Sequence, residues 1–311
     1  MAVRYAAFGS AFLNLTYSQE MFTDSPTIPT QLEVLLDVVH AMRQRRASPE
    51  TLQQLIQPKG LPDLTAKSAQ LSNHLSAARE LELVKIDNNN NDVRLSYAVY
   101  GEHQPKDAIV HAFDRIALAD DRVERWAGRF YAYLIMQEND TIQTDEAKAL
   151  ADRFMADLPS TIERGNPMND TKYRYLERWY VYVGLGWNDP AGAFTPDPTE
   201  RLRRALPTVW GRDRMLDADQ FLERVGQACP ELDGGSLFDE VNVGVYSPSA
   251  RRCTQALATA LRRLHDEGNI RLHCPADSKG WGLEKAGSSP VAGESSNRFN
   301  SVERLALRGA A

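Results

Sequence analysis

The chain has 311 residues, of which 42% are hydrophobic and 25% are charged, and its formal net charge is −6. This length and composition suit two or three folded domains, and they exclude global disorder and the fibrous classes. The apolar stretches are short and interrupted by charges, so no transmembrane helix is expected. A negative net charge is unusual for a protein dominated by nucleic-acid binding.

The first 30 residues form an N-terminal arm whose beginning, residues 1–17, is apolar. We do not interpret it as a secretory signal, because Gly9, Ser10 and Asn14 interrupt the apolar part and Arg4 is its only basic residue. The chain has three cysteines, an odd number that favours reduced thiols over a disulfide framework. The expected location is therefore cytoplasmic.

Residues 31–100 follow the order of a winged helix-turn-helix module. Apolar residues recur at helical spacing over 31–46, and a second helix starts after Ser48 and stops at Pro58. A third helix is predicted to begin after Pro62 and Asp63 and to run to about Leu81. Two alternating runs, 83–86 and 93–97, flank a turn rich in asparagine and predict a hairpin, which would be the wing.

Residues 101–197 predict an acidic helical domain, with 17 Asp and Glu against 11 Lys and Arg. Helical patterns cover 108–118, 123–137, 145–158 and 172–185. The aromatic residues of the last pattern favour a packed core over a surface for stacking nucleic-acid bases, since an acidic domain repels the phosphate backbone. Turn-forming residues from Trp187 to Pro198 mark the end of this domain.

Residues 198–311 predict a second winged-helix-like module. Helices are expected over 199–210, with Pro207 as a candidate break, over 217–228, and over 249–265. An insertion at 231–246 carries a candidate strand from Val241 to Tyr246. Strands at 270–273 and 281–284 would form a second wing, a Gly- and Ser-rich stretch near 286–300 is expected to be flexible, and a last strand covers 302–307. The fold class is therefore mainly α, with two modules of this kind joined by a helical domain.

The outward side of each third helix supplies the candidate DNA contacts. In the first module we expect Ser68 and His74 of the third helix to face outward. Three arginines, Arg43, Arg45 and Arg46, precede the second helix. An exposed helix is polar in any case, and the wing tip, flanked by Asp87 and Asp92, is a poor phosphate clamp. The second module has the better basic face, with further arginines on its first helix. The candidate residues are Lys67, Gln70, Asn73 and Arg79 in the first module, and Arg251, Arg252, Arg262 and Arg271 in the second.

No pattern in the sequence predicts catalysis, a metal or a cofactor. The cysteines and histidines from Cys229 to Cys274 lack the spacing of a zinc site. A phosphate-binding G-x-x-x-x-G-K-[ST] loop and a G-x-S-x-G nucleophile motif are both missing from the sequence. We expect a protein that is not an enzyme.

Four stretches carry a family resemblance: IPTQLEVLLDVVHAMRQ, PDPTERLRRALP, DADQFLERVGQACPELDGG and ALATALRRLHDEGNIRL. They resemble the DpdG-like proteins of bacterial phage-defence islands, which place 7-deazaguanine derivatives in DNA. The resemblance implies a winged-helix factor that works beside helicases and ATPases and has no catalytic residues.

The leading hypothesis is a non-enzymatic subunit of an anti-phage defence complex that binds or senses double-stranded DNA. One alternative is an adaptor whose modules and acidic middle domain bind a helicase or ATPase subunit. Another is a transcriptional regulator, which would form a homodimer.

Overall fold

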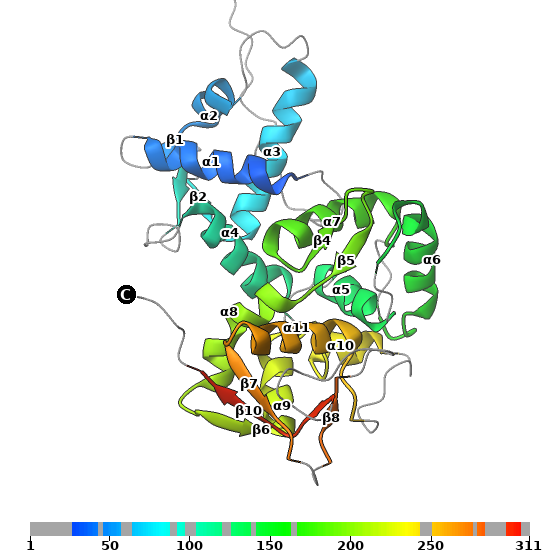
Figure 1. Ribbon diagram of the computed structural model, residues 1–311. Coiled ribbons are helices and arrows are strands. Elements are labelled where there is room, and N and C mark those ends of the chain that lie inside the picture. The colour runs from blue at the N-terminus through cyan, green and yellow to red at the C-terminus, as the bar shows by residue number, and fades with distance from the viewer. Residues whose placement is uncertain are drawn as a thin grey trace, which may run out of the picture.

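The computed structural model describes most of the chain as a mainly helical protein with small antiparallel sheets, which confirms the predicted fold class (Figure 1). Side chains are described throughout the ranges that follow, except at residues 64–70 and 144. The described residues are 27–42, 46–56, 64–87, 92–96, 104–119, 126–137, 141–162, 167–242, 251–275, 279–283 and 297–305.

The first module packs its first and third helices against a three-stranded sheet, and its second helix packs on the first. Pro29 occupies the first turn of its first helix, where a missing N–H does no harm, and the Ser48 hydroxyl accepts the Thr51 N–H at the start of the second. The strand order is β1-β3-β2, and both pairings are antiparallel. The elements are α1 (Pro29–Ala41), β1 (Arg46–Ala47), α2 (Pro49–Ile56), α3 (Leu64–Glu80), β2 (Val84–Ile86) and β3 (Val93–Leu95).

The middle domain packs around aromatic side chains, as its sequence predicted. Tyr173, Trp179 and Tyr180 are buried, and the Tyr180 hydroxyl donates to the Ala127 carbonyl at 2.7 Å. A buried aromatic with its polar atom satisfied belongs to a core and not to a stacking platform. The elements are α4 (Pro105–Ala112), which continues as the π-helix η3 (Phe113–Ala117), then α5 (Trp126–Met136), the 3₁₀ turn η4 (Thr144–Glu146), α6 (Ala147–Asp157), α7 (Asp170–Val183), β4 (Gly186–Asn188) and β5 (Phe194–Pro196).

The second module repeats the topology of the first. Its sheet has the order β6-β10-β7, so the last strand is again central, and α10 and the β8–β9 pair are additions to the common plan. The elements are α8 (Thr199–Trp210), β6 (Met215–Asp217), α9 (Ala218–Ala228), α10 (Ser236–Val241), α11 (Gln255–Asp266), β7 (Ile270–His273), β8 (Trp281–Gly282), β9 (Arg298–Phe299) and β10 (Ser301–Arg304).

Several sequence-based expectations for the second module were wrong. The helix expected from residue 249 begins at Gln255, because Thr254 caps it and residues 251–254 are not helical. Pro207 does not break α8, which continues to Trp210. The strand at 281–284 does not pair with β7, because β10 takes that place and β8 pairs with β9 instead. The insertion contains the helix α10 up to Val241, and residues 243–246 of the candidate strand lie outside the described residues.

None of the helices in the described ranges combines the length and apolar character needed to cross a membrane.

Candidate nucleic-acid interface

Arg251 lies in the non-helical segment before α11 and forms contacts on the surface of its own module. Its guanidinium donates to both carboxylate oxygens of Asp219, at 2.9 and 2.6 Å, and lies 5.8 Å from the centre of the Trp281 ring. Trp281 in turn donates its indole N–H to Asp219 at 2.7 Å. Arg251 also has a left-handed backbone with φ of 48°, which is uncommon for a residue with a Cβ. A phosphate would have to compete with Asp219 for this side chain.

The other candidate arginines of the second module differ in accessibility. Arg252 is exposed and forms an isolated backbone bridge with Gly282, and Arg271 is exposed on β7. Arg262 is half-buried: one guanidinium nitrogen donates to Asn297 at 3.3 Å, while its buried Nε has no hydrogen-bond partner. Burial lowers the pKa of this guanidinium.

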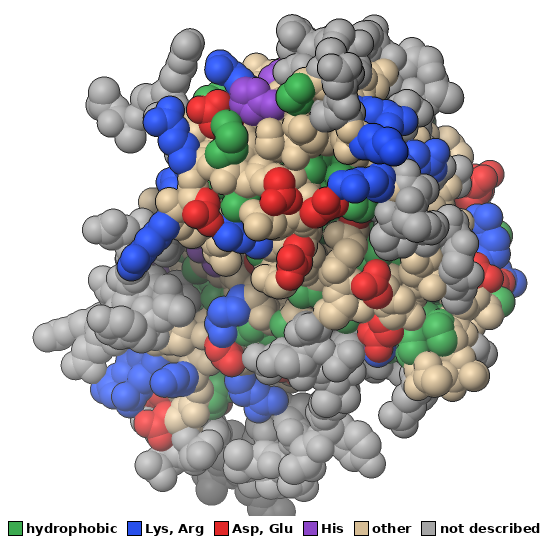
Figure 2. Space-filling model, turned by 90° about the horizontal axis from the view of Figure 1, so that it is seen from below, with side chains coloured by type: hydrophobic (Ala, Val, Ile, Leu, Met, Phe, Trp, Pro, Cys, Tyr) green, Lys and Arg blue, Asp and Glu red, His purple; other side chains and the backbone are tan. Residues whose placement is uncertain are grey.

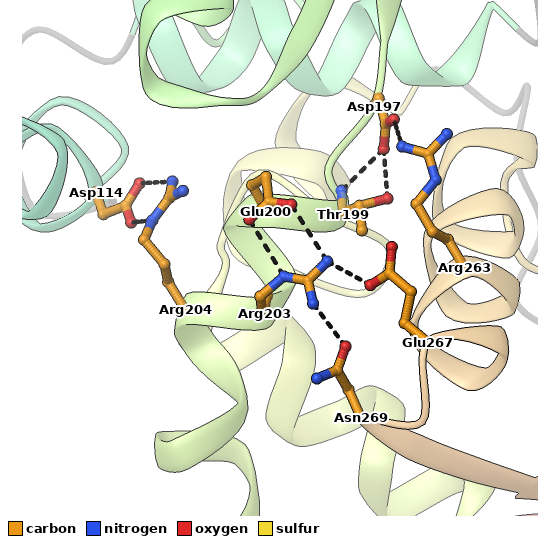
Figure 3. A network of polar contacts seen from close by, with 9 residues as sticks. All are labelled: Asp114, Asp197, Thr199, Glu200, Arg203, Arg204, Arg263, Glu267 and Asn269. Atoms are coloured by element: carbon orange, nitrogen blue, oxygen red, sulfur yellow. Dashed lines mark hydrogen bonds and ion pairs between the residues drawn. The ribbon is translucent and has the colours of Figure 1, made fainter. Parts of the chain in front are cut away.

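Arginines of α8 and α11 hold the second module together and fix it to the middle domain (Figure 3). Arg204 makes a two-pronged ion pair with Asp114 of η3, at 2.6 and 3.0 Å. Arg263 of α11 pairs with Asp197, which precedes α8. The basic residues that favoured this module as a DNA-binding surface are therefore largely neutralised by the chain itself.

The same close-up shows Arg203 at the centre of a second group of contacts, between α8 and the end of α11 (Figure 3). Its guanidinium donates to Glu267 and Asn269, both at 2.6 Å, and to Glu200 at 3.2 Å. Three acceptors around one guanidinium leave little donor capacity for an external anion.

The start of α11 is occupied by an internal carboxylate. Asp233 is 3% exposed and accepts the Thr254 backbone N–H at 2.6 Å and the Thr254 hydroxyl at 2.7 Å. The N-terminus of a helix attracts anions because its first N–H groups lack partners within the helix. Here that attraction is used by a buried side chain of the same module.

The outer surface of the second module is correspondingly mixed in charge. Seen from below, acidic side chains lie among the Lys and Arg side chains, many of them near the middle of the face (Figure 2). On the module's sheet, Glu303 of the central strand lies opposite Arg271 and accepts from His273 at 3.2 Å.

In the first module, the structure places two of the four candidate side chains. Arg79 is exposed near the end of α3 and Asn73 is half-buried, while Lys67 and Gln70 belong to α3 but their side chains are not described. His74 does not face outward as expected. It is 5% exposed, and its Nε2 accepts the Ile28 backbone N–H at 3.4 Å.

Sequence reasoning missed Lys85 and Arg94 of the first module's sheet. Each is the exposed middle residue of a three-residue strand, between neighbours that face the core. Together with Arg46 of β1 they form one row on the exposed face of the sheet, because Arg94 lies opposite Arg46 on one side and Lys85 on the other. The alternation of the two strands was the signal available in the sequence. Arg43 and Arg45 lie outside the described residues.

Within the described ranges, no group of three or more His, Cys, Asp or Glu side chains is arranged to hold a metal ion. The three cysteines are buried, and burial raises the pKa of the Cys229 and Cys253 thiols, which disfavours the thiolate form that binds metals.

Fold and surface thus define a mainly helical protein with two modules of one topology, of which the first has the row of exposed cations. The model of the DpdG-like family matches residues 21–278, so the chain belongs to the DpdG-like family, and the resemblance seen in the sequence is confirmed. Through this membership the protein is related to DNA modification and defence.

Comparison with other proteins adds little to the family assignment. No curated protein matches the sequence. Two solved structures of the restriction endonuclease FokI are distantly similar, one of them bound to DNA. The first is 12% identical with a TM-score of 0.30, covering 58% of this chain and 39% of that one. The DNA-bound structure is 11% identical with a TM-score of 0.28, covering 68% of this chain and 51% of that one. The chain therefore spans between two fifths and one half of FokI, and scores this low carry no argument.

Proposed function

We propose that the protein is a non-catalytic, DNA-binding subunit of an anti-phage defence complex, and that both modules are winged helix-turn-helix modules. The proposal is supported by family membership and by the element order, in which the third helix of such a module is the one that enters a DNA groove. The partner is double-stranded DNA, and the protein acts beside other subunits such as a helicase or ATPase.

The observation that carries the proposal is the contrast between the two third helices. The N-terminal part of α3 extends away from the middle domain (Figure 1). Its counterpart α11 is fixed at its start by Asp233 and near its end by the contacts of Arg263 and Glu267. A third helix whose two ends are held by side chains of the same chain is the poorer candidate reader, so we assign the main DNA contact to the first module. Arg251, Arg252, Arg262 and Arg271 remain predicted contacts of a second, weaker surface.

The proposal is tested by measuring the affinity of the full chain for a labelled duplex by fluorescence anisotropy between 50 and 200 mM salt. Binding should weaken steeply with salt, because each neutralised phosphate releases counterions. The variant with Asn73→Ala and Arg79→Ala should bind several-fold more weakly, and the variant with Arg251→Ala and Arg252→Ala should lose less. Failure of the wild-type chain to bind duplex DNA at 50 mM salt would refute the proposal.

An adaptor role is the second candidate, and the exposed Trp187 favours it. Trp187 lies on β4 of the acidic middle domain with 47% of its surface accessible, and tryptophan is enriched at protein interfaces. Co-purification of a basic partner subunit that survives nuclease treatment and is lost with Trp187→Ala would support this role. A partner that dissociates on nuclease treatment would speak for DNA as the bridge.

A further inference from the structure

We propose that the exposed face of the first module's sheet binds the phosphate backbone of duplex DNA, through the row formed by Arg46, Arg94 and Lys85. This inference rests on the proposed function and goes beyond it by assigning the grip on phosphate to the sheet face, whereas a winged helix is expected to use its third helix and wing tip.

The row is fixed by strand register. Arg94 of the central strand β3 lies directly opposite Arg46 of β1 and directly opposite Lys85 of β2. All three residues are exposed, and the residues next to them along β3, Val93 and Leu95, are buried. Residues paired across neighbouring strands lie about 5 Å apart, so the three cations extend across about 10 Å of surface. Duplex DNA presents one charge per about 1.7 Å of its axis, so such a row faces several phosphates.

Like charges directly opposite one another in a sheet are destabilising, which makes an external anion the natural complement of this row. The chain compensates it only in part. Asp87 accepts from Arg94 at 3.2 Å, and Asp92 lies 3.9 Å from Arg46. Both arginine side chains keep more than 40% of their surface accessible despite these contacts. Lys85, at the end of the row, has no ion pair among the described residues.

The second module shows that this topology does not require a cationic row. The positions that correspond to Arg46, Arg94 and Lys85 are Met215, Glu303 and Arg271, by the same pairing of the central strand with its two neighbours. There the Glu303 carboxylate occupies the centre of the row, and nitrogen atoms of Arg214 and His273 lie within 4 Å of it. The same sheet face is therefore self-neutralised in one module and cationic in the other, and only the cationic one suits a polyanion.

The test compares the double variant, with Lys85→Ala and Arg94→Ala, to a matched control variant, with Arg298→Ala and Arg304→Ala. Arg298 of β9 and Arg304 of β10 are exposed in the second module and are not among the predicted contacts, so the control also removes two cations from short strands. Duplex affinity is measured against salt concentration, and thermal unfolding confirms that each variant is folded. If the double variant does not fold, the variant with Lys85→Gln and Arg94→Gln is used in its place, because glutamine removes the charge and keeps a polar side chain at the surface.

We expect the double variant to weaken binding on duplexes of unrelated sequence and to reduce the slope of log affinity against log salt by about 2, one for each lost phosphate contact. The control variant should leave the slope unchanged. If the wild-type chain binds duplex DNA and the folded double variant keeps the same slope, the inference is overturned while the proposed function stands. If the wild-type chain does not bind duplex DNA, the proposed function itself fails. A double variant that loses binding to anionic lipid vesicles but keeps its duplex affinity would also overturn the inference.

Discussion

The buried ion pair between Arg201 and Glu231 gives a quantitative prediction for Arg201→Met. Glu231 is fully buried, and the Arg201 side chain is 6% exposed and donates to it at 2.9 Å. Arg201 also donates to the Ala228 carbonyl at 2.8 Å and lies 3.5 Å from Asp114. Removing one partner of a buried pair leaves an uncompensated charge, which typically costs about 3–5 kcal/mol of stability. We expect Arg201→Met to lower the free energy of unfolding by that amount at pH 8.

The cost should depend on pH, because the carboxyl can take up a proton. Burial raises the pKa of Glu231, and the charge of Arg201 opposes that rise. Without Arg201 the pKa in the folded state rises further above its value in the unfolded chain. A carboxyl with a raised folded pKa binds more protons when folded, so its stability contribution falls as pH rises through that pKa. Arg201→Met should therefore be less destabilising at pH 5 than at pH 8.

The assay is urea denaturation followed by tryptophan fluorescence at both pH values, with Arg115→Met as the matched control. Arg115 pairs with Glu82 at the same 2.9 Å distance, but both side chains are more than half exposed. An exposed pair contributes at most about 1 kcal/mol. The variant with Arg201→Met and Glu231→Leu should recover most of the lost stability, since it leaves no unpaired charge. The reasoning is refuted if Arg201→Met costs no more than Arg115→Met, or if its cost is the same at pH 5 and pH 8.

Three further predictions concern the second module. Asp233→Ala should lower the stability of the second module by about 2–3 kcal/mol, because the Thr254 N–H and hydroxyl lose a charged acceptor at a buried site. An unchanged midpoint of thermal unfolding would contradict this. Gly226→Ala should destabilise the folded protein by about 1–3 kcal/mol, since the new Cβ would lie 2.6 Å from the Gly234 carbonyl oxygen. An unchanged stability would mean that the turn at Gly234 can move aside at little cost. The three buried thiols should react with a thiol reagent only after denaturation, so a fast reaction in the folded protein would disprove their burial.

Helices were the part of the fold that the sequence predicted best. Helical spacing of apolar residues predicted α3 and α7 to within about two residues, because each helix buries one continuous stripe against a core. The helix predicted over 31–46 exists as α1 but ends at Ala41, and Arg46 belongs to β1. The short strands β1 and β6 were not predicted. They have two and three residues, too few for an alternation to be visible, and they exist because the central strands β3 and β10 provide a pairing edge.

The surface was harder to predict than the fold, because a sequence does not show which charges meet. Arg204 and Asp114 are 90 residues apart along the chain, and Arg263 and Asp197 are 66 apart. Nothing local distinguishes these arginines from free ones. His74 was misplaced for a related reason, since the backbone N–H that it accepts belongs to Ile28, before α1. The row of Arg46, Arg94 and Lys85 depends on strand register, which neither a charge count nor a helical wheel reveals.

Charge counts alone favour the second module as the main DNA-binding surface, whereas the function that we propose assigns the main DNA contact to the first module. Residues 198–311 carry 16 Lys and Arg against 15 Asp and Glu, and residues 31–100 carry 8 against 8, so by this count the second module is the more basic. What attracts a polyanion is the field of cations that the chain does not itself neutralise. The ion pairs of Arg201, Arg203, Arg204 and Arg263 remove most of that field from the second module. The first module, although neutral in total, gathers three exposed cations on one face of its sheet. Lys85 has no ion pair among the described residues, and Arg46 and Arg94 keep more than 40% of their side-chain surface accessible beside Asp92 and Asp87, so an approaching phosphate backbone would meet that face.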